Sequence, residues 1–150
     1  MPKINLVRGP SCEPVFFASY RHCKPKGERV MATDDKCCSI VPYFKVPEQN
    51  QASFKALCEK FVEKTCTEPQ CHYYGFSFSG DLAHCREAYA DAQGLLDHLQ
   101  NVGSLLQEAL KIAELVRLEV HGPESELAKL REPLANLNPQ FFTLEYGFRK

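Results

Sequence analysis

The chain has 150 residues, of which 44% are hydrophobic and 25% charged, with a formal net charge of −1. These values fit one soluble domain with a real core, and they exclude the broad positive field that attracts nucleic acids or anionic membranes. No apolar run approaches the about 18 residues that a membrane helix needs, and the start, MPKINLVRGP, lacks the apolar stretch of a secretory signal, so we expect a cytoplasmic protein.

Residues 1–36 form an irregular and basic N-terminal extension. They hold seven Lys/Arg against four Asp/Glu, a charge of +3, so the remaining residues carry −4 of the total of −1. Prolines and the loop-like KPKGE interrupt this part, in which only PVFFASY is compatible with a strand. The extension is either a basic arm or a solvated tail, and we place the folded domain at 37–150.

From residue 37 onward the hydrophobic pattern becomes regular. CCSIVPYFKV (37–46) favours a strand at a sheet edge or with a bulge, because Pro42 has no N–H to donate. In NQASFKALCEKFVEKTC the apolar residues from Phe54 to Val62 recur at helical spacing. Two strand-like runs then flank Gly80-Asp81, which is the signal of a β-hairpin.

The second half predicts a helix, a strand, a short helix and a last strand. Asp91 is a candidate N-cap for a leucine-rich helix over 91–113, and ELVRLEV (114–120) alternates like a half-buried strand. Pro123 lies near the start of the short helix, and FFTLEYGF (141–148) is the last strand.

The order of elements from residue 37 is β-α-β-β-α-β, followed by a short helix and a strand. This is the split βαβ, or ferredoxin-like, arrangement of the α+β class, with an antiparallel sheet that carries two helices on one face. The other face of the sheet has to be covered. A second copy of the chain is the simplest cover, so we expect a homodimer.

A two-residue hairpin loop at Gly80-Asp81 fixes which side chains share a face of the sheet, because directly opposed residues point the same way. His84 and Arg86 fall on one face. The other face is mostly aromatic and includes one carboxylate; it carries His72, Tyr74, Phe76, Phe78, Ala83, Cys85, Glu87 and Tyr89. A slip of one residue would reverse this assignment.

Glu87 and His98 are the candidate catalytic residues. A carboxylate among aromatic side chains tends to have a raised pKa unless a cation compensates. His98 shares a helix face with Leu95 and Val102, so its ring is expected to be at least half-buried. A Glu–His pair could orient a phenolic or quinone-like ligand and remove its proton. The alternative is structural: the pair ties a helix to a strand.

Eight cysteines are a high count, and they sit at 12, 23, 37, 38, 58, 66, 71 and 85. The spacings of Cys37-Cys38 and of Cys66 and Cys71 do not form the paired clips that zinc prefers, and disulfide frameworks belong to short secreted chains. We therefore expect reduced structural thiols and no metal. A thiol-based redox function at one of these two pairs is a weaker alternative.

The run YYGFSFSGDLAHCREAYADAQGLLDHLQN resembles the antibiotic biosynthesis monooxygenase family. Its features are a Tyr-bearing strand, a hairpin, a strand that ends Glu-x-aromatic, an Asp that opens a helix, and a His in the second turn of that helix. Glu87, Tyr89, Asp91 and His98 occupy these positions. The resemblance covers about residues 37–121, with a closing strand at 141–148. It implies a dimeric α/β barrel with a pocket inside each subunit.

Enzymes of this family oxidise polycyclic phenols or quinols with O2 and no cofactor, because the deprotonated substrate itself passes an electron to oxygen. The resemblance thus implies a small aromatic or carbonyl substrate, with Glu87 and His98 as the acid–base residues. It implies that four side chains bind the substrate: His72, Tyr74, Phe76 and Tyr89.

The chain departs from the family pattern in two places. The aromatic residue after the Glu is usually Trp, whereas here it is Tyr89 and the chain contains no Trp. Haem-degrading relatives place an axial histidine further along the second helix, and no histidine occurs here between His98 and His121. We therefore expect no cofactor. A non-catalytic dimeric binding or stress-response protein of the same fold is the alternative function.

Overall fold

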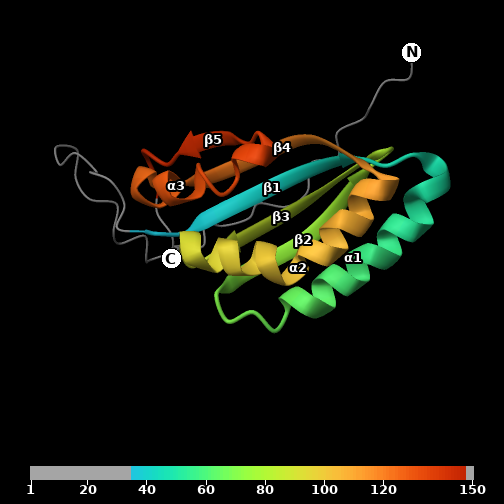
Figure 1. The fold of residues 1–150 in the computed structure, drawn as a ribbon, viewed down its shortest axis with the longest axis horizontal. Coiled ribbons are helices and arrows are strands. Elements are labelled where there is room, and N and C mark those ends of the chain that lie inside the picture. The colour runs from blue at the N-terminus through green and yellow to red at the C-terminus, as the bar shows by residue number, and fades with distance from the viewer. Residues whose placement is uncertain (1–34, 148–150) are drawn as a thin grey trace, which may run out of the picture.

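The computed structural model describes residues 35–147, which form five strands and three α-helices (Figure 1). The elements are β1 (Cys38–Lys45), η1 (Glu48–Asn50), α1 (Gln51–Thr65), β2 (Cys71–Ser79), β3 (Leu82–Tyr89), α2 (Ala92–Ile112), β4 (Glu114–Gly122), α3 (Glu124–Leu130), η2 (Ala135–Leu137) and β5 (Gln140–Thr143). The predicted order of elements is confirmed. The segment PVFFASY, Cys12 and Cys23 lie outside the described residues.

The sheet has the strand order β2-β3-β1-β4-β5, and α1 and α2 lie side by side across one of its faces (Figure 1). The four strands of the ferredoxin-like unit pair antiparallel, as predicted. β5 differs, because the crossover through α3 and η2 brings it back parallel to β4. β5 also ends at Thr143 rather than 148, since its partner in the ladder, Gly122, is the last residue of β4.

Pro42 lies in the middle of the sheet, so of the two predicted alternatives, a sheet edge or a bulge, the second is the one present. β1 runs between β3 and β4, and the predicted irregularity is present: the register against β4 shifts between Tyr43 and Phe44. Toward β3, the ladder is interrupted between the pairs Ile40↔Glu87 and Tyr43↔His84. A proline cannot donate to either neighbour, so the sheet accommodates it by this local break next to Glu87.

The core fills the space between the sheet and the helices in two adjoining clusters. Tyr89, Leu95 and Val120 belong to the cluster under α3 and the start of α2, and Phe54 and Val102 to the cluster under α1. Each fully buried side chain of this size stabilises the fold by about 1.5–3 kcal/mol. None of the helices within residues 35–147 combines the length and hydrophobicity that a membrane crossing requires.

Two carboxylates fix the start of α2. Asp91 is the N-cap, as predicted, and accepts a hydrogen bond from Gly94 N at 2.9 Å. Glu126 of α3 is buried and accepts from Ala92 N at 3.2 Å, while Lys129 donates to it at 2.8 Å. Negative charge at this end also suits the dipole of the helix. The position of every residue in the first turns of α2 therefore depends on α3.

Gly94 allows the loop between α1 and β2 to pack directly on α2. A Cβ at this position would lie 2.8 Å from Gln70 Oε1 and 2.9 Å from Gln70 Cβ, which is too close for a real contact. The same loop is tied at its end, because Ala90 N donates to Gln70 O at 2.9 Å. This close approach requires glycine at position 94.

The two glycines of α2 provide a matched pair of variants. We expect Gly94→Ala to lower the free energy of unfolding by about 1–3 kcal/mol, because the new methyl group displaces Gln70. Gly103→Ala should raise it by about 0.5–1 kcal/mol, since a Cβ there meets nothing within 4 Å and alanine favours the helix. Urea denaturation measures both, and shifts of the same sign would contradict this packing.

Candidate active site

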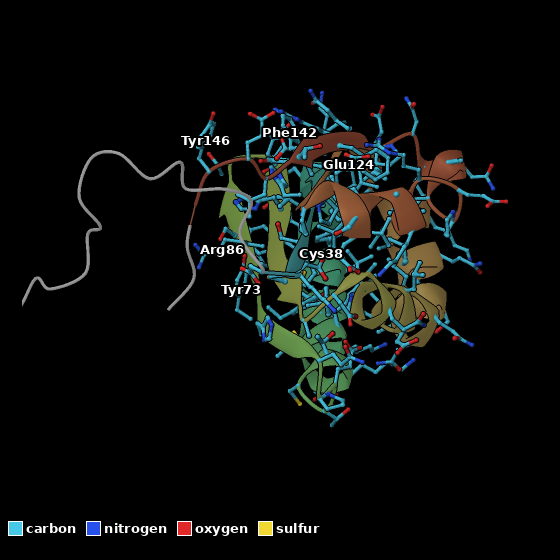
Figure 2. The ribbon with its side chains drawn as sticks, turned by 90° about the vertical axis from the view of Figure 1, so that its left-hand side faces the viewer. Cys38, Tyr73, Arg86, Glu124, Phe142 and Tyr146 are labelled. Atoms are coloured by element: carbon cyan, nitrogen blue, oxygen red, sulfur yellow. The ribbon has the colours of Figure 1, made fainter. Side chains whose placement is uncertain are left out.

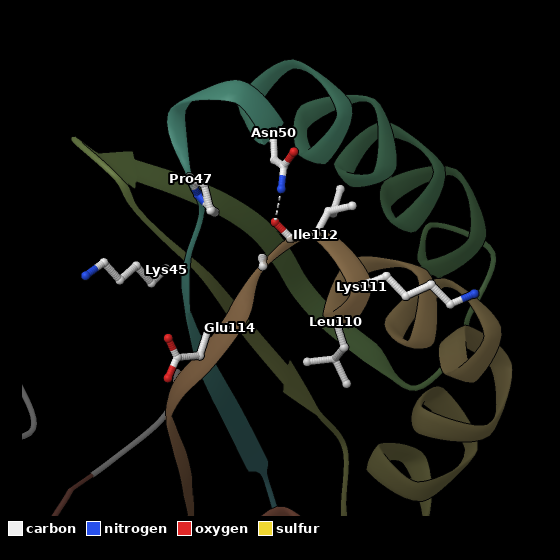
Figure 3. Close-up of a pocket in the computed structure, with 8 residues that line it drawn as sticks. Lys45, Pro47, Asn50, Leu110, Lys111, Ile112 and Glu114 are labelled. Carbon is white, nitrogen blue, oxygen red and sulfur yellow. Dashed lines mark hydrogen bonds between the residues drawn. The ribbon is translucent and has the colours of Figure 1, made fainter.

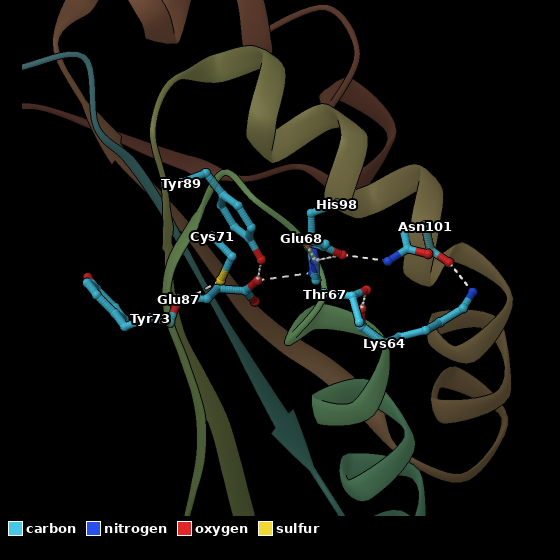
Figure 4. A network of polar contacts seen from close by, with 9 residues as sticks. All are labelled: Lys64, Thr67, Glu68, Cys71, Tyr73, Glu87, Tyr89, His98 and Asn101. Atoms are coloured by element: carbon cyan, nitrogen blue, oxygen red, sulfur yellow. Dashed lines mark hydrogen bonds and ion pairs between the residues drawn. The ribbon is translucent and has the colours of Figure 1, made fainter.

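Glu87 and His98 meet in the layer between the sheet and α2 (Figure 4). β3 places Glu87 on its helix-facing side, and α2 places His98 on its sheet-facing side together with Leu95 and Val102. His98 Nε2 lies 3.1 Å from Glu87 Oε2, and the two residues are only 2% and 4% exposed. The predicted contact between the two side chains is present, and their catalytic role stays a prediction.

Tyr89 also binds Glu87, through a hydroxyl that donates to the same oxygen, Oε2. Neither the His98 contact nor the Tyr89 contact uses Oε1 of Glu87. Burial raises the pKa of the Tyr89 hydroxyl far above its ordinary value, and the negative charge of Glu87 raises it further. The phenol therefore stays neutral and acts as a hydrogen-bond donor to the carboxylate.

Glu68 completes the site, and sequence reasoning missed it. His98 Nδ1 lies 2.9 Å from Glu68 Oε2 and 3.0 Å from Oε1, and Asn101 Nδ2 donates to Oε1 at 2.6 Å (Figure 4). Glu68 comes from the α1–β2 loop, which Gly94 holds against α2. A polar residue in a loop after a helix carries no pattern of its own. The one available signal is Asn101, which follows His98 by three positions on the same face of α2.

The imidazole of His98 lies between two carboxylates, which we call the Glu68–His98–Glu87 triad. Burial acts to lower the pKa of His98, but the hydrogen bond and charge of Glu87, and then those of Glu68, act in the other direction. The balance raises the pKa of His98 above its ordinary value. The two carboxylates therefore favour the positively charged form of the His98 ring.

The triad borders a small internal cavity of about 40 Å³. Glu87 and His98 are the two ionisable residues of its lining. The other lining residues are hydrophobic and mostly aliphatic: Ile40, Pro42, Phe44, Leu99, Val102, Leu106, Leu115, Leu118 and Leu137. A cavity of this size has room for a few water molecules. The arrangement therefore places an acid–base pair against an apolar space, at the point where Pro42 interrupts the sheet.

The predicted substrate-binding residues lie elsewhere around the triad, and none of them lines this cavity. The rings of Tyr74 and Tyr89 pack on His98, with centroid distances of 5.5 and 4.9 Å. Phe76 packs on Tyr74 and on Phe61 of α1. These three aromatic residues therefore support the imidazole from the side, whereas aliphatic side chains shape the cavity.

His72 is exposed, and the regular hairpin register, which would place it opposite Tyr89, is wrong at this position. The partner of Tyr89 is Cys71, and the partner of Ala88 is Tyr73, so His72 is an extra residue in β2. A bulge of this kind shifts the register by one position. The predicted register between β2 and β3 holds from the hairpin loop back to Tyr73 and fails between Tyr73 and Cys71.

The opposite face of the sheet carries His84 and Arg86, as predicted, and pairs aromatic rings with cations. His84 stacks on Tyr43 at 5.3 Å, and the Arg86 guanidinium lies over Tyr73 at 5.5 Å (Figure 2). Glu119 lies on the same face, where Arg117 and His121 bind it. We call this surface the open face, because no helix of residues 35–147 covers it.

A larger hollow lies at the far end of the sheet, with a volume of about 570 Å³ (Figure 3). It shares no lining residue with the cavity at the triad. Asn50 Nδ2 donates to Ile112 O at 2.8 Å there, which ties the start of α1 to the end of α2. Its lining includes Lys45 and Glu114, whose charges offset each other. The hollow is wide open, and we assign it no chemistry despite its size.

Of the cysteines in the described residues, all except Cys66 are buried or partly buried, and their role as structural thiols stays a prediction. Cys66 and Cys71 are free thiols, as are Cys38, Cys58 and Cys85. Burial raises the pKa of the Cys38 and Cys58 thiols to about 12 and that of Cys71 to about 11, so these thiols are unreactive near neutral pH. Within residues 35–147, no group of three potential metal ligands comes together.

The fold of this chain is similar to those of several solved structures. No protein-family model matches the chain, and no curated protein does. The crystal structure of MupZ from Pseudomonas fluorescens is 52% identical, with a TM-score of 0.78 over 82% of this chain and 96% of MupZ.

Two provisionally named antibiotic biosynthesis monooxygenases share the fold at low identity. The protein from Nitrosomonas europaea is 13% identical, with a TM-score of 0.56 over 61% of this chain and 94% of its own. The protein from Caulobacter crescentus is 18% identical, with a TM-score of 0.53 over 57% of this chain and 88% of its own. The chain therefore belongs to the same family as MupZ, and its fold is that of the antibiotic biosynthesis monooxygenases.

Proposed function

We propose that this protein is an acid–base enzyme that removes a proton from a small, largely apolar molecule and so opens a cofactor-independent oxygenation. The observation that carries the proposal is the buried Glu68–His98–Glu87 triad at the wall of an apolar cavity. Buried acid–base groups that are held by specific partners are typical of catalytic sites. The fold shared with named monooxygenases supports the oxygenation step.

In this mechanism Glu87 is the base. Its oxygen Oε1, which neither Tyr89 nor His98 uses, accepts the proton of the substrate. The positively charged ring of His98 then lies close to the substrate anion and stabilises it. The hydrophobic lining excludes water, so the anion is not protonated again before it meets oxygen.

Molecular oxygen from solution is the oxidant. The substrate anion gives an electron to O2, and the two radicals combine to form a peroxide on the same carbon. Loss of water from the peroxide, with the proton that Glu87 holds, leaves a carbonyl group. A CH2 group and O2 thus become C=O and H2O, which balances the step. In its keto form, a phenolic or quinol-type aromatic compound, the substrate class that the resemblance implies, carries such an acidic CH2 group.

A non-catalytic binding protein is the second candidate function, and the volume of the cavity favours it. About 40 Å³ is less than an aromatic substrate occupies, so a ligand has to displace part of the lining. Leu137 of η2 is the one lining residue that lies outside the sheet and α2. If the lining side chains do not move apart to admit a ligand, the triad has only the structural role of tying α2 to β3 in a filled core.

We also propose that the protein is a homodimer in which the open face is the interface. Val41 and Tyr43 lie on this face, opposite Glu119 and Arg117 of β4, and the Arg117 guanidinium lies 5.6 Å from the centre of the Tyr43 ring. The His84 ring stacks on Tyr43 on the same face, with the ring centroids 5.3 Å apart. Two such faces packed together would form the barrel that the resemblance implies.

Substitution of the base tests the enzyme proposal, with dithranol, a tricyclic hydroxyanthrone, as the probe. We expect Glu87→Gln and His98→Ala to lower oxygen uptake and quinone formation by about 100- to 10,000-fold, the usual contribution of general acid–base groups. Glu59→Gln removes an exposed carboxylate of α1 and should keep full turnover. Wild-type protein that binds dithranol but consumes no oxygen would favour the binding protein instead.

Sedimentation equilibrium tests the dimer. The wild type should have twice the 17.0 kDa mass of one chain. Val41→Arg places a charge at the centre of the open face, and we expect it to weaken the dimer on the order of 100-fold because burying an unpaired charge is costly. Ser104→Arg, on the exposed side of α2, is the control and should leave the dimer unchanged. A monomeric wild type would refute the interface.

A further inference from the structure

We infer that Glu68 is the positioning residue of this site, which fixes the orientation of the His98 ring and holds a proton on each of its nitrogens. The inference rests on the proposed function for its catalytic meaning, but its structural content can be measured without a substrate. It assigns a role to a loop residue that touches neither the cavity nor the proposed base.

The hydrogen-bond chemistry of the two ring nitrogens leads to this conclusion. Nδ1 faces Glu68 at 2.9 and 3.0 Å, and Nε2 faces Glu87 at 3.1 Å. Ionised carboxylates only accept hydrogen bonds, and a neutral imidazole has one donor and one acceptor nitrogen. A neutral ring would therefore turn a lone pair toward one of the two carboxylates. Only the doubly protonated ring satisfies both partners at once.

Glu68 is itself held in place from two sides. Asn101 Nδ2 donates to its Oε1 at 2.6 Å, and the Lys64 ammonium binds the backbone carbonyl of Asn101 (Figure 4). The close packing of Gln70 on Gly94 fixes the loop that carries Glu68. A hydrogen-bond partner on one ring nitrogen of a histidine commonly decides which of the two nitrogens carries a proton. Here that partner is Glu68, on the nitrogen that faces away from the proposed base.

Solvent reaches the triad from the side of Glu68. The Glu68 side chain is 14% exposed, whereas those of His98 and Glu87 are 3% and 5% exposed. Protons can therefore enter and leave the site through Glu68 rather than through the apolar cavity. The titratable or charged groups around the triad and its supporting contacts are Lys64 from α1, Cys71 and Tyr74 from β2, and Cys85 and Tyr89 from β3.

Removal of the Glu68 charge should change the state of the ring in a defined way. Glu68→Gln keeps the size of the side chain and one acceptor oxygen but leaves Glu87 as the single carboxylate on His98. The ring then loses its proton at lower pH, because an opposite charge within hydrogen-bond distance shifts a pKa by about 1–3 units. The proton lost should be the one on Nδ1, since Nε2 still faces the Glu87 carboxylate.

Nitrogen-15 NMR of the His98 ring, recorded across a pH titration of the full-length protein without ligand, tests the inference. In the wild type, both nitrogens should stay protonated above the ordinary titration pH of a histidine. In Glu68→Gln the titration should move down by about one pH unit or more and end in the Nε2–H tautomer. Glu59→Gln removes the same charge from an exposed site of α1 and should leave the titration of His98 unmoved.

Two further variants keep the test decisive if Glu68→Gln does not fold. Asn101→Ala frees the Glu68 carboxylate, so we expect a smaller shift in the same direction. Glu68→Asp retains the charge and should keep most of the wild-type titration. A neutral His98 in the wild type at pH 7, or an unmoved titration in both Glu68→Gln and Asn101→Ala, would overturn the inference.

Turnover of dithranol separates this inference from the proposed function. If the wild type consumes no oxygen, the oxygenase proposal fails while the NMR titration still decides the role of Glu68. If the wild type is active, the pH profile of oxygen uptake in Glu68→Gln should shift in parallel with the titration of His98. A uniform loss of rate without a shift would mean that Glu68 acts only on stability.

Discussion

Two carboxylates and an imidazole share a space from which water is largely excluded, and this burial of charge constrains the rest of the structure. Each ion that leaves water costs several kcal/mol, which only close and well-oriented partners offset. The triad meets this condition with contacts of 2.9 to 3.1 Å at both ring nitrogens. Removing either carboxylate leaves the ring with an unmatched hydrogen bond, so the three residues stabilise the fold only together.

Several contacts outside the triad hold its three side chains at these distances from one another. Asp91 and Glu126 fix the first turn of α2, and Gly94 lets the loop with Glu68 approach that turn. On the side of the sheet, the interruption at Pro42 leaves space next to Glu87 where a regular ladder would close it. The packing thus brings together a loop, a strand and a helix that are distant in sequence.

How much of this could be predicted depends on whether a residue belongs to a periodic pattern. The hairpin loop at Gly80-Asp81 predicted the face on which Glu87 lies, and helical spacing predicted the buried side of His98. Both follow from local geometry. The Asp91 cap was predictable for the same reason, because its hydrogen bond closes within three residues.

The features that escaped prediction depend on contacts between distant segments. Glu68 lies in a loop, and nothing in its neighbourhood indicates that His98 will reach it across 30 positions. The cavity could not be predicted from local patterns, since its lining comes from five separate elements, β1, β3, α2, β4 and η2. The parallel direction of β5 follows from the crossover through α3, and the wrong place of His72 follows from one extra residue in β2.

That extra residue has a consequence for how the protein avoids unwanted assembly. β2 is an edge strand of nine residues, and its outer rim of backbone groups could template an added strand from another molecule. The bulge at His72 breaks the regular spacing of that rim near its start and increases the local twist. An incoming strand could match only the part between the bulge and the hairpin, so the irregularity works against amyloid-like growth from this edge of the sheet.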